Sequence, residues 1–151
     1  MSKYDDNVAE MTASSNVYPI MFKGEVIERY FVSKEGDFFG PQMGLSQPLT
    51  IFYPPDHDTN PYPRVTVGGK GVTCHTLMAH TFVDYPTGDR PDGFEDLPEE
   101  WQKYIVENEK RYVMELQVDH KNGDKYDWSI DNLRWCTSKE NQQYYQKEQR
   151  R

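Results

Sequence analysis

The chain has 151 residues, which is the size of one ordinary domain. Hydrophobic residues make up 36% of it and aromatic residues 14%, with 11 tyrosines, 7 phenylalanines and 3 tryptophans. This aromatic content excludes an intrinsically disordered chain, because disordered sequences are poor in aromatic residues. No segment approaches the roughly 18 consecutive apolar residues that a membrane-spanning helix needs, so we expect no membrane partner.

The formal net charge of −8 is unevenly distributed along the chain. Residues 84–109 hold nine acidic residues against two basic ones, whereas residues 117–151 hold seven basic residues against six acidic ones. The net charge of the whole chain therefore does not decide what it binds. A charged surface helix is the simplest account of the acidic segment, and a DNA-mimicking or regulatory role is the alternative.

The N-terminus and the cysteines indicate the compartment. The first 17 residues contain three acidic residues and lack the charged-then-apolar pattern of a secretory signal. Cys74 and Cys136 are isolated and form no CxxC pattern, which argues against a disulfide framework. We therefore expect a cytoplasmic location.

Short strands are predicted over most of the N-terminal half. Residues 1–16 are polar and without periodicity, so we expect a flexible tail there. β-rich runs bounded by turn residues predict strands further on. These predicted strands cover residues 17–22, 25–32, 37–39 and 49–53.

A hairpin and a short helix are predicted next. Two β-rich runs flank the glycine-rich residues 68–71, which predicts a hairpin over 64–75. Apolar residues at helical spacing predict a helix over 76–83. After a loop over 84–97, Pro98 and two glutamates predict the start of a charged helix over 98–110.

The C-terminal part is predicted to be a strand, a loop, a strand and a helix. Residues 112–120 alternate like a strand, and a polar loop with an Asn-Gly turn leads to a short strand over 133–135. Thr137 and Glu140 form a capping box, so a helix is predicted to follow to about Lys147.

Three polar residues of this part indicate hydrolytic chemistry. Asp119 and His120 end the predicted strand, and Asn141 lies in the first turn of the predicted helix. A hairpin that folds back onto the helix brings all three side chains into one small site. Carboxylate and amide oxygens suit Mg²⁺ or a similar ion, and a histidine free of the metal can take a proton from water. Metal with a histidine base is the minimum needed to hydrolyse a phosphodiester.

The same residues resemble a known family. Residues 119–124 (DHKNGD), 132–135 (NLRW) and 140–141 (EN) are similar to the HNH (ββα-metal) nuclease motif. The closest resemblance is to phage and intron homing endonucleases whose third motif position is Asn. His120 and Asn132 are 12 residues apart, and Asn132 and Asn141 are 9 apart, as in that subgroup.

Two upstream stretches are also similar to elements of these enzymes. Residues 30–38 resemble an element near their N-termini, and residues 75–82 resemble a helix that contains a histidine followed by an arginine. Thr76 takes the place of that arginine here, which removes a phosphate contact. The resemblance is loose over residues 18–83 and close over 116–145.

The resemblance implies a role for each motif residue. His120 is expected to be the general base that activates water. Asp119 and Asn141 are expected to bind one divalent ion, Mg²⁺ or Mn²⁺, at the scissile phosphate. Asn132 is expected to hold the loop and keep His120 oriented. Because the two cysteines are isolated, no structural zinc is expected.

Several basic and histidine side chains are candidate DNA contacts around this site. His75 and His80 are five residues apart, which is not one helix face, so we interpret them as structural or DNA-facing rather than as zinc ligands. The turn at 68–71 is too short for a P-loop and presents Lys70 to the DNA backbone. The candidate DNA-binding residues are Lys70, His75, Lys121, Lys125, Arg134 and Lys139.

We therefore expect an α+β fold with a β-rich N-terminal half and a C-terminal ββα-metal (His-Me finger) nuclease unit. The expected regions are a flexible tail (1–16), a β-rich DNA-positioning region (17–83), an acidic loop and connecting helix (84–112) and the nuclease unit (113–151).

The expected function is a metal-dependent HNH endonuclease of the homing type that acts on double-stranded DNA. It is expected to be free-standing and phage-encoded, acting in the host bacterial cytoplasm. A non-catalytic DNA-binding accessory protein is the alternative, and activity that depends on a protein partner or a dimer also remains open.

Overall fold

The computed structural model describes residues 2–55, 60–85 and 92–137, without the side chains of residues 110 and 112–114. The described helices and strands are α1 (Lys3–Ala13), β1 (Val17–Phe22), β2 (Glu25–Ser33), β3 (Phe38–Phe39), β4 (Arg64–Val67), β5 (Lys70–Thr73), α2 (Cys74–Phe82), α3 (Glu99–Met114), β6 (Gln117–His120) and β7 (Leu133–Cys136). Short 3-10 turns lie between these elements at η1 (Gly44–Ser46), η2 (Phe94–Asp96) and η3 (Ile130–Asn132). This mixture of helices and small sheets confirms the predicted α+β class.

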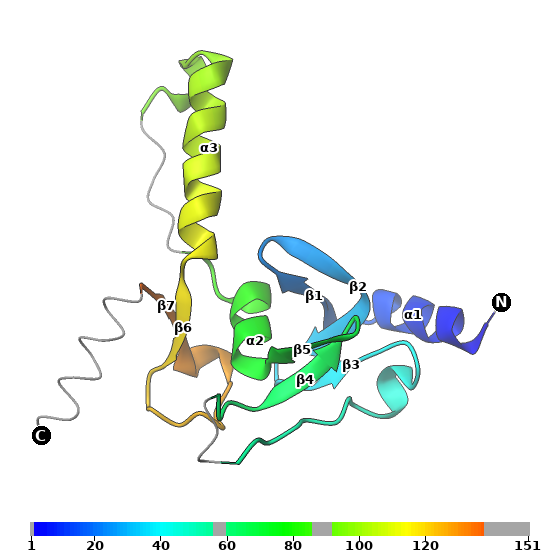
Figure 1. The fold of residues 1–151 in the computed structure, drawn as a ribbon. Helices are drawn as coiled ribbons and strands as arrows, with labels where there is room; N and C mark the ends of the chain where they lie inside the picture. Colours follow the sequence, from blue (N-terminus) through cyan, green and yellow to red (C-terminus); the bar gives the residue numbers. More distant parts are fainter. Residues whose placement is uncertain (1, 56–59, 86–91, 138–151) are drawn as a thin grey trace, which may run out of the picture.

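The strands form three small antiparallel sheets, in the orders β1-β2-β3, β4-β5 and β6-β7 (Figure 1). The strands predicted over 17–22, 25–32 and 37–39 and the hairpin predicted over 64–75 are all present. Lys23 and Gly24 close the first hairpin with φ values of 52° and 81°. Two successive residues in the left-handed region match the twist of the flanking strands, which is why this turn joins β1 to β2 tightly.

Helix α2 lies at the centre of the core. Its buried side chains pack with residues from β1, β2, β3, β4 and β7, so that all three sheets share one hydrophobic cluster. The fully or nearly buried members of this cluster are Ile20, Val32, Phe38, Val65, Val67, Cys74, Leu77, Met78, Ala79 and Leu133. Each sheet is too small to bury a core by itself, so the helix is the element that holds them together.

The first 13 residues differ from the prediction. Residues 1–16 were expected to be a flexible tail, but α1 occupies most of this segment. Ser2 caps the helix because its Oγ accepts a hydrogen bond from the Asp5 backbone N–H. Met11 is fully buried in a second cluster with Val17 and Phe31. Val8 also packs against this cluster, and Asn7 Nδ2 donates to the Pro41 carbonyl at 2.8 Å, so a cap and several tertiary contacts fix the helix.

The connecting helix is longer than predicted. Helix α3 runs to Met114, so residues 112–114 belong to the helix, and strand β6 contains only residues 117–120. The strand predicted over 49–53 is reduced to one bridge between Phe52 and Arg64. Prolines on both sides of this segment cannot donate the hydrogen bonds that a longer ladder needs.

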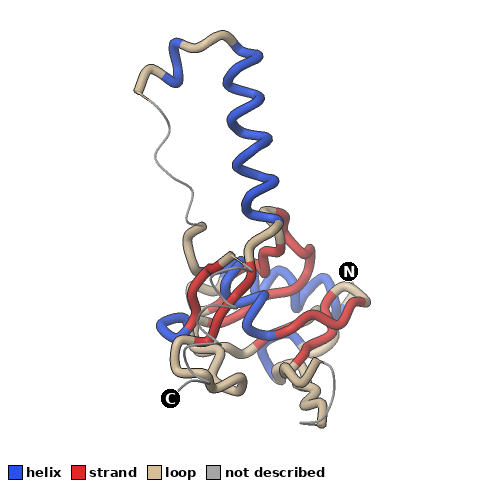
Figure 2. Tube along the Cα trace, turned by 60° about the vertical axis from the view of Figure 1, so that its left-hand side comes forward, coloured by secondary structure: helices blue, strands red, loops and turns tan. Residues whose placement is uncertain are grey.

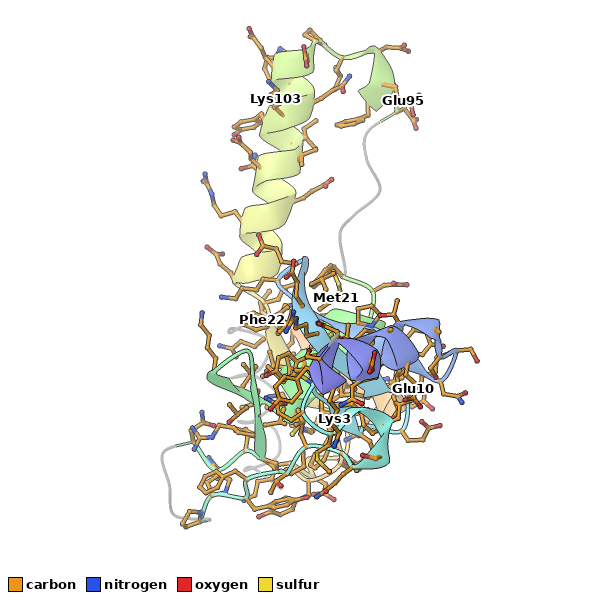
Figure 3. All side chains as sticks on the ribbon, turned by 90° about the vertical axis from the view of Figure 1, so that its right-hand side faces the viewer. Lys3, Glu10, Met21, Phe22, Glu95 and Lys103 are labelled. Carbon is orange, nitrogen blue, oxygen red and sulfur yellow. The ribbon has the colours of Figure 1, made fainter. Side chains whose placement is uncertain are left out.

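Helix α3 projects away from the rest of the molecule (Figure 1, Figure 2). Lys103 and Glu95 lie near the end of this projection that is farthest from the sheets (Figure 3). Among the described helices, none is long and apolar enough to cross a membrane.

Gly36 is expected to be indispensable for docking the loop that carries Trp128. Gly36 has a φ of 93°, and a Cβ added there would lie 2.7 Å from Nε1 of Trp128. Gly36→Ala is therefore expected to lower the free energy of unfolding for two reasons. The steric clash costs about 1–3 kcal/mol, and the left-handed backbone of an alanine costs about 1–2 kcal/mol. Urea unfolding measures the sum.

Gly24→Ala is the matched control for this prediction. Gly24 has a φ of 81° with nothing within 4 Å of the added Cβ, so it reports the left-handed conformation alone. Equal losses of unfolding free energy in the two variants would contradict the predicted clash with Trp128.

Candidate active site

The β6-β7 hairpin presents the first two motif residues on opposite faces. Asp119 pairs with Arg134 across the hairpin, and His120 pairs with Leu133. Because side chains alternate along a strand, His120 points to the core beside the buried Leu133, whereas Asp119 and Arg134 share the other face. Arg134 Nε donates a hydrogen bond of 2.9 Å to Asp119 Oδ2.

Asn132 braces the loop that follows His120. Its Oδ1 accepts a 3.0 Å hydrogen bond from the Asn122 N–H, and its Nδ2 donates to Asn122 Oδ1 at 3.0 Å and to the Asp127 carbonyl at 2.8 Å. The Lys121 N–H also donates to the Asn132 carbonyl at 2.7 Å. These bonds connect both ends of the loop, and a buried amide satisfied in this way fixes one conformation.

Two histidines and a tyrosine form the buried side of the site. His75 comes from α2 and His120 from β6, and their ring centroids are 4.6 Å apart. Tyr62 stacks on His120, with ring centroids 5.8 Å apart and planes at 4°, and also contacts the His75 ring. His75 and His120 are only 8% and 5% exposed. Nδ1 of His75 and Nε2 of His120 are buried and have no hydrogen-bond partner among the described residues.

Burial keeps both histidines neutral. Removal from water, together with a smaller effect of the neighbouring His120, lowers the pKa of His75 to about 3. Burial also lowers the pKa of His120, although the carboxylates of Asp119, Asp124 and Asp127 oppose this shift. Both rings are therefore uncharged at neutral pH, and an uncharged imidazole has a nitrogen that can accept a proton.

Asp119 is the predicted metal ligand that the structure describes. Asp119 supplies a mostly buried carboxylate on the face of the hairpin opposite His120, and carboxylate oxygen is a preferred ligand of Mg²⁺. The described residues contain no group of three or more His, Cys, Asp or Glu side chains that could hold a metal. Asn141, the second predicted ligand, lies outside the described residues, as does the predicted helix after Thr137.

The predicted DNA contacts lie in different surroundings. Lys121 and Lys125 belong to the braced loop, and Lys70 begins β5 on the other hairpin. Arg134 is ion-paired with Asp119, and His75 is buried against His120 rather than exposed on a surface. Lys139 lies outside the described residues.

Tyr62 is the site residue that sequence reasoning missed. It lies between Pro61 and Pro63 in a segment without regular periodicity, so no pattern connects it with His120, which is 58 positions away. The pairing of Arg134 with Asp119 could have been predicted from the sequence. An antiparallel hairpin between the two predicted strands places these residues opposite each other.

The buried His75 is expected to make stability depend on pH. An unfolded histidine has a pKa near 6.5 and the folded one about 3, so the unfolded chain binds more protons between these values. The free energy of unfolding therefore falls as the pH falls below 6.5. His75→Gln should lose less stability between pH 7.5 and pH 5 than the unmodified chain, as measured by urea unfolding. Tyr62→Phe, which contacts the same ring and keeps the histidine, should retain the full difference.

Comparison with known proteins found similarity to HNH endonucleases. Residues 87–143 match the HNH endonuclease family model. A solved structure concerning DNA binding and cleavage by the HNH homing endonuclease I-HmuI is similar, with 26% sequence identity and a TM-score of 0.50. The match covers 80% of this chain and 53% of the other, so this chain spans about half the length of that protein. No curated protein sequence matches the chain significantly. The motif, the family-model match over residues 87–143 and the structural match all indicate that this chain is similar to HNH endonucleases.

Proposed function

We propose that the chain is a divalent-metal-dependent DNA endonuclease that hydrolyses phosphodiester bonds. The observation that carries this proposal is the neutral, buried His120, which directly follows Asp119 in strand β6 and starts a loop that Asn132 braces. A neutral imidazole next to a carboxylate supplies a proton acceptor and a cation ligand within one short hairpin.

His120 takes the proton of the attacking water in this proposal. Its ring is held by the stacked Tyr62 on one side and by His75 from α2. This packing limits rotation of the imidazole, and a base that is already oriented avoids the cost of ordering it during the reaction. Asn132 keeps the loop after His120 in one conformation.

HNH nucleases generally use a divalent metal, and Asp119 with Asn141 would hold it here. The ion would stabilise negative charge on the phosphate and on the leaving 3′-oxygen. The products expected from this reaction are a 5′-phosphate and a 3′-hydroxyl.

Double-stranded DNA is the proposed substrate. The similar homing endonuclease binds and cleaves DNA, and Lys121 and Lys125 in this chain lie in the loop that begins at the proposed base. A homing-type enzyme that is free-standing, phage-encoded and cytoplasmic is the corresponding biological proposal. Its support is the resemblance of the motif to phage and intron enzymes.

One observation favours a non-catalytic DNA-binding protein as the second candidate. Arg134 Nε contacts Asp119 Oδ2 at 2.9 Å, so a carboxylate oxygen that a metal would use is already paired with a cation. The acidic helix α3 is a further feature that the cleavage mechanism does not use. Activity of the purified chain separates the two candidates.

His120→Ala is expected to reduce cleavage of supercoiled plasmid by at least about 100-fold, because general-base catalysis contributes roughly 10²–10⁴-fold. Gel electrophoresis after incubation with Mg²⁺ or Mn²⁺, beside an EDTA control, measures conversion to open-circular or linear DNA. His80→Gln is the matched control, because His80 is a second partly buried histidine with a lowered pKa on α2. Undiminished cleavage by His120→Ala would falsify the assignment of the base.

Asp119→Asn is expected to weaken binding of Mn²⁺ by about tenfold or more, because a neutral amide replaces a charged oxygen ligand. Isothermal titration calorimetry with the metal alone measures this without any cleavage. Asp131→Asn is the control, since Asp131 is exposed on η3 and is not a predicted ligand. If both variants bind Mn²⁺ as the unmodified chain does, Asp119 is not a metal ligand.

A further inference from the structure

Aromatic rings from two segments meet on the surface next to the candidate active site. Tyr53 lies 6.0 Å from Tyr126 and 6.4 Å from Trp128, measured between ring centroids. Tyr53 is 56% exposed and Tyr126 is 46% exposed, whereas Trp128 is half-buried beneath the chain surface. We call these three residues the aromatic platform. Large aromatic side chains with this exposure that gather at one place mark an interaction surface.

The aromatic platform is continuous with the site because the same two segments form both. Tyr53 belongs to the platform, and Tyr62, nine positions later in the chain, stacks on His120. Residues 120–128 supply His120 to the site and Tyr126 and Trp128 to the platform. Asn132 bonds both to the Asn122 N–H and to the Asp127 carbonyl, so the loop that carries Tyr126 and Trp128 folds back onto the strand end at His120.

Hydrogen bonds to the body of the protein fix Phe52, which precedes Tyr53, and the Trp128 ring. The Phe52 N–H donates to the Arg64 carbonyl at 2.8 Å, and the Arg64 N–H donates to the Phe52 carbonyl at 2.9 Å. Trp128 Nε1 donates to the Gly36 carbonyl at 3.1 Å. The rings are therefore presented with little remaining backbone freedom, which lowers the entropic cost of binding a ligand.

Two cationic side chains lie beside aromatic rings of this surface. Lys125 Nζ lies 5.1 Å from the Tyr126 ring centroid, and Arg64 Cζ lies 5.7 Å from that of the exposed Phe52. The loop also contains Asp124 and Asp127, and their carboxylates accept hydrogen bonds from groups of the loop itself. Aromatic faces beside lysine and arginine are the combination that binds bases and phosphates of single strands.

We propose that the aromatic platform binds unpaired nucleobases of a single-stranded DNA segment beside the scissile phosphate. This proposal rests on the proposed endonuclease function, which supplies the DNA. Bases of an intact duplex already stack on each other and expose no faces, so rings of this kind stack only on bases that are unpaired or turned out of the helix. The platform therefore favours substrates that are locally opened next to the cut.

The test is binding of a dye-labelled oligothymidylate and of a dye-labelled duplex to the full chain, measured by fluorescence anisotropy in EDTA so that no cleavage occurs. The variant Tyr53→Ala with Tyr126→Ala should weaken binding of the single strand by about tenfold or more, since each stacked base contributes roughly 5- to 150-fold. Its binding of the duplex should change by less than about threefold, because phosphate contacts dominate there.

The matched control removes two equally exposed aromatic rings elsewhere. Trp101 and Tyr104 on α3 are 58% and 60% exposed, and Trp101→Ala with Tyr104→Ala should leave binding of the single strand unchanged. Tyr53→Phe with Tyr126→Phe should also retain it, because the ring faces remain. Urea unfolding midpoints of all variants show that the comparison concerns folded protein.

The possible failures are distinguishable. Equal binding of oligothymidylate by the platform variant and the α3 variant, or no binding by the unmodified chain, overturns the platform proposal. If the double phenylalanine variant loses as much oligothymidylate binding as the double alanine variant, the proposal is also overturned. The hydroxyl groups rather than the ring faces would then make the contact. If the unmodified chain binds the single strand through the platform but never cleaves plasmid with Mg²⁺ or Mn²⁺, the endonuclease function fails and the binding site stands.

Discussion

The fold depends on burial of one short helix. Each of the three sheets has only two or three strands, and such sheets are not stable on their own. Leu77, Met78 and Ala79 of α2 are fully buried and contribute to the cluster that all three sheets share. The helix that holds the sheets together also carries His75, so the same packing that stabilises the fold places one wall of the site.

The site contains buried polar groups with hydrogen-bond partners and buried polar groups without a partner among the described residues. Asn132 has its amide satisfied by the loop it braces, and such a group adds order at little cost. His75 and His120 each keep one buried ring nitrogen without a partner among the described residues. Unsatisfied buried groups cost stability, and natural proteins keep them mainly where chemistry needs them.

Sequence patterns predicted the local elements better than the contacts between them. The hairpin over 64–75 could be predicted from the local alternation of side chains. The strand that ends at His120 and the loop that ends at Asn132 could be predicted from motif spacing. Both signals lie within short stretches of the chain. Helix α1 was missed because tertiary contacts of Asn7, Val8 and Met11 hold it, and Tyr62 because no periodicity connects it with His120. The β6 boundary was misplaced because residues 112–114 suit a helix and a strand alike.

The three tryptophans lie in three different surroundings, with an optical consequence. Trp101 is exposed on the projecting α3, Trp128 donates its indole N–H to Gly36, and Trp135 donates its own to the Val83 carbonyl while packing on His80. Water-exposed indoles emit at longer wavelengths than buried ones. Acrylamide quenching of intrinsic fluorescence can therefore separate the projecting helix from the loop beside the site and from the core, with no label attached to the chain.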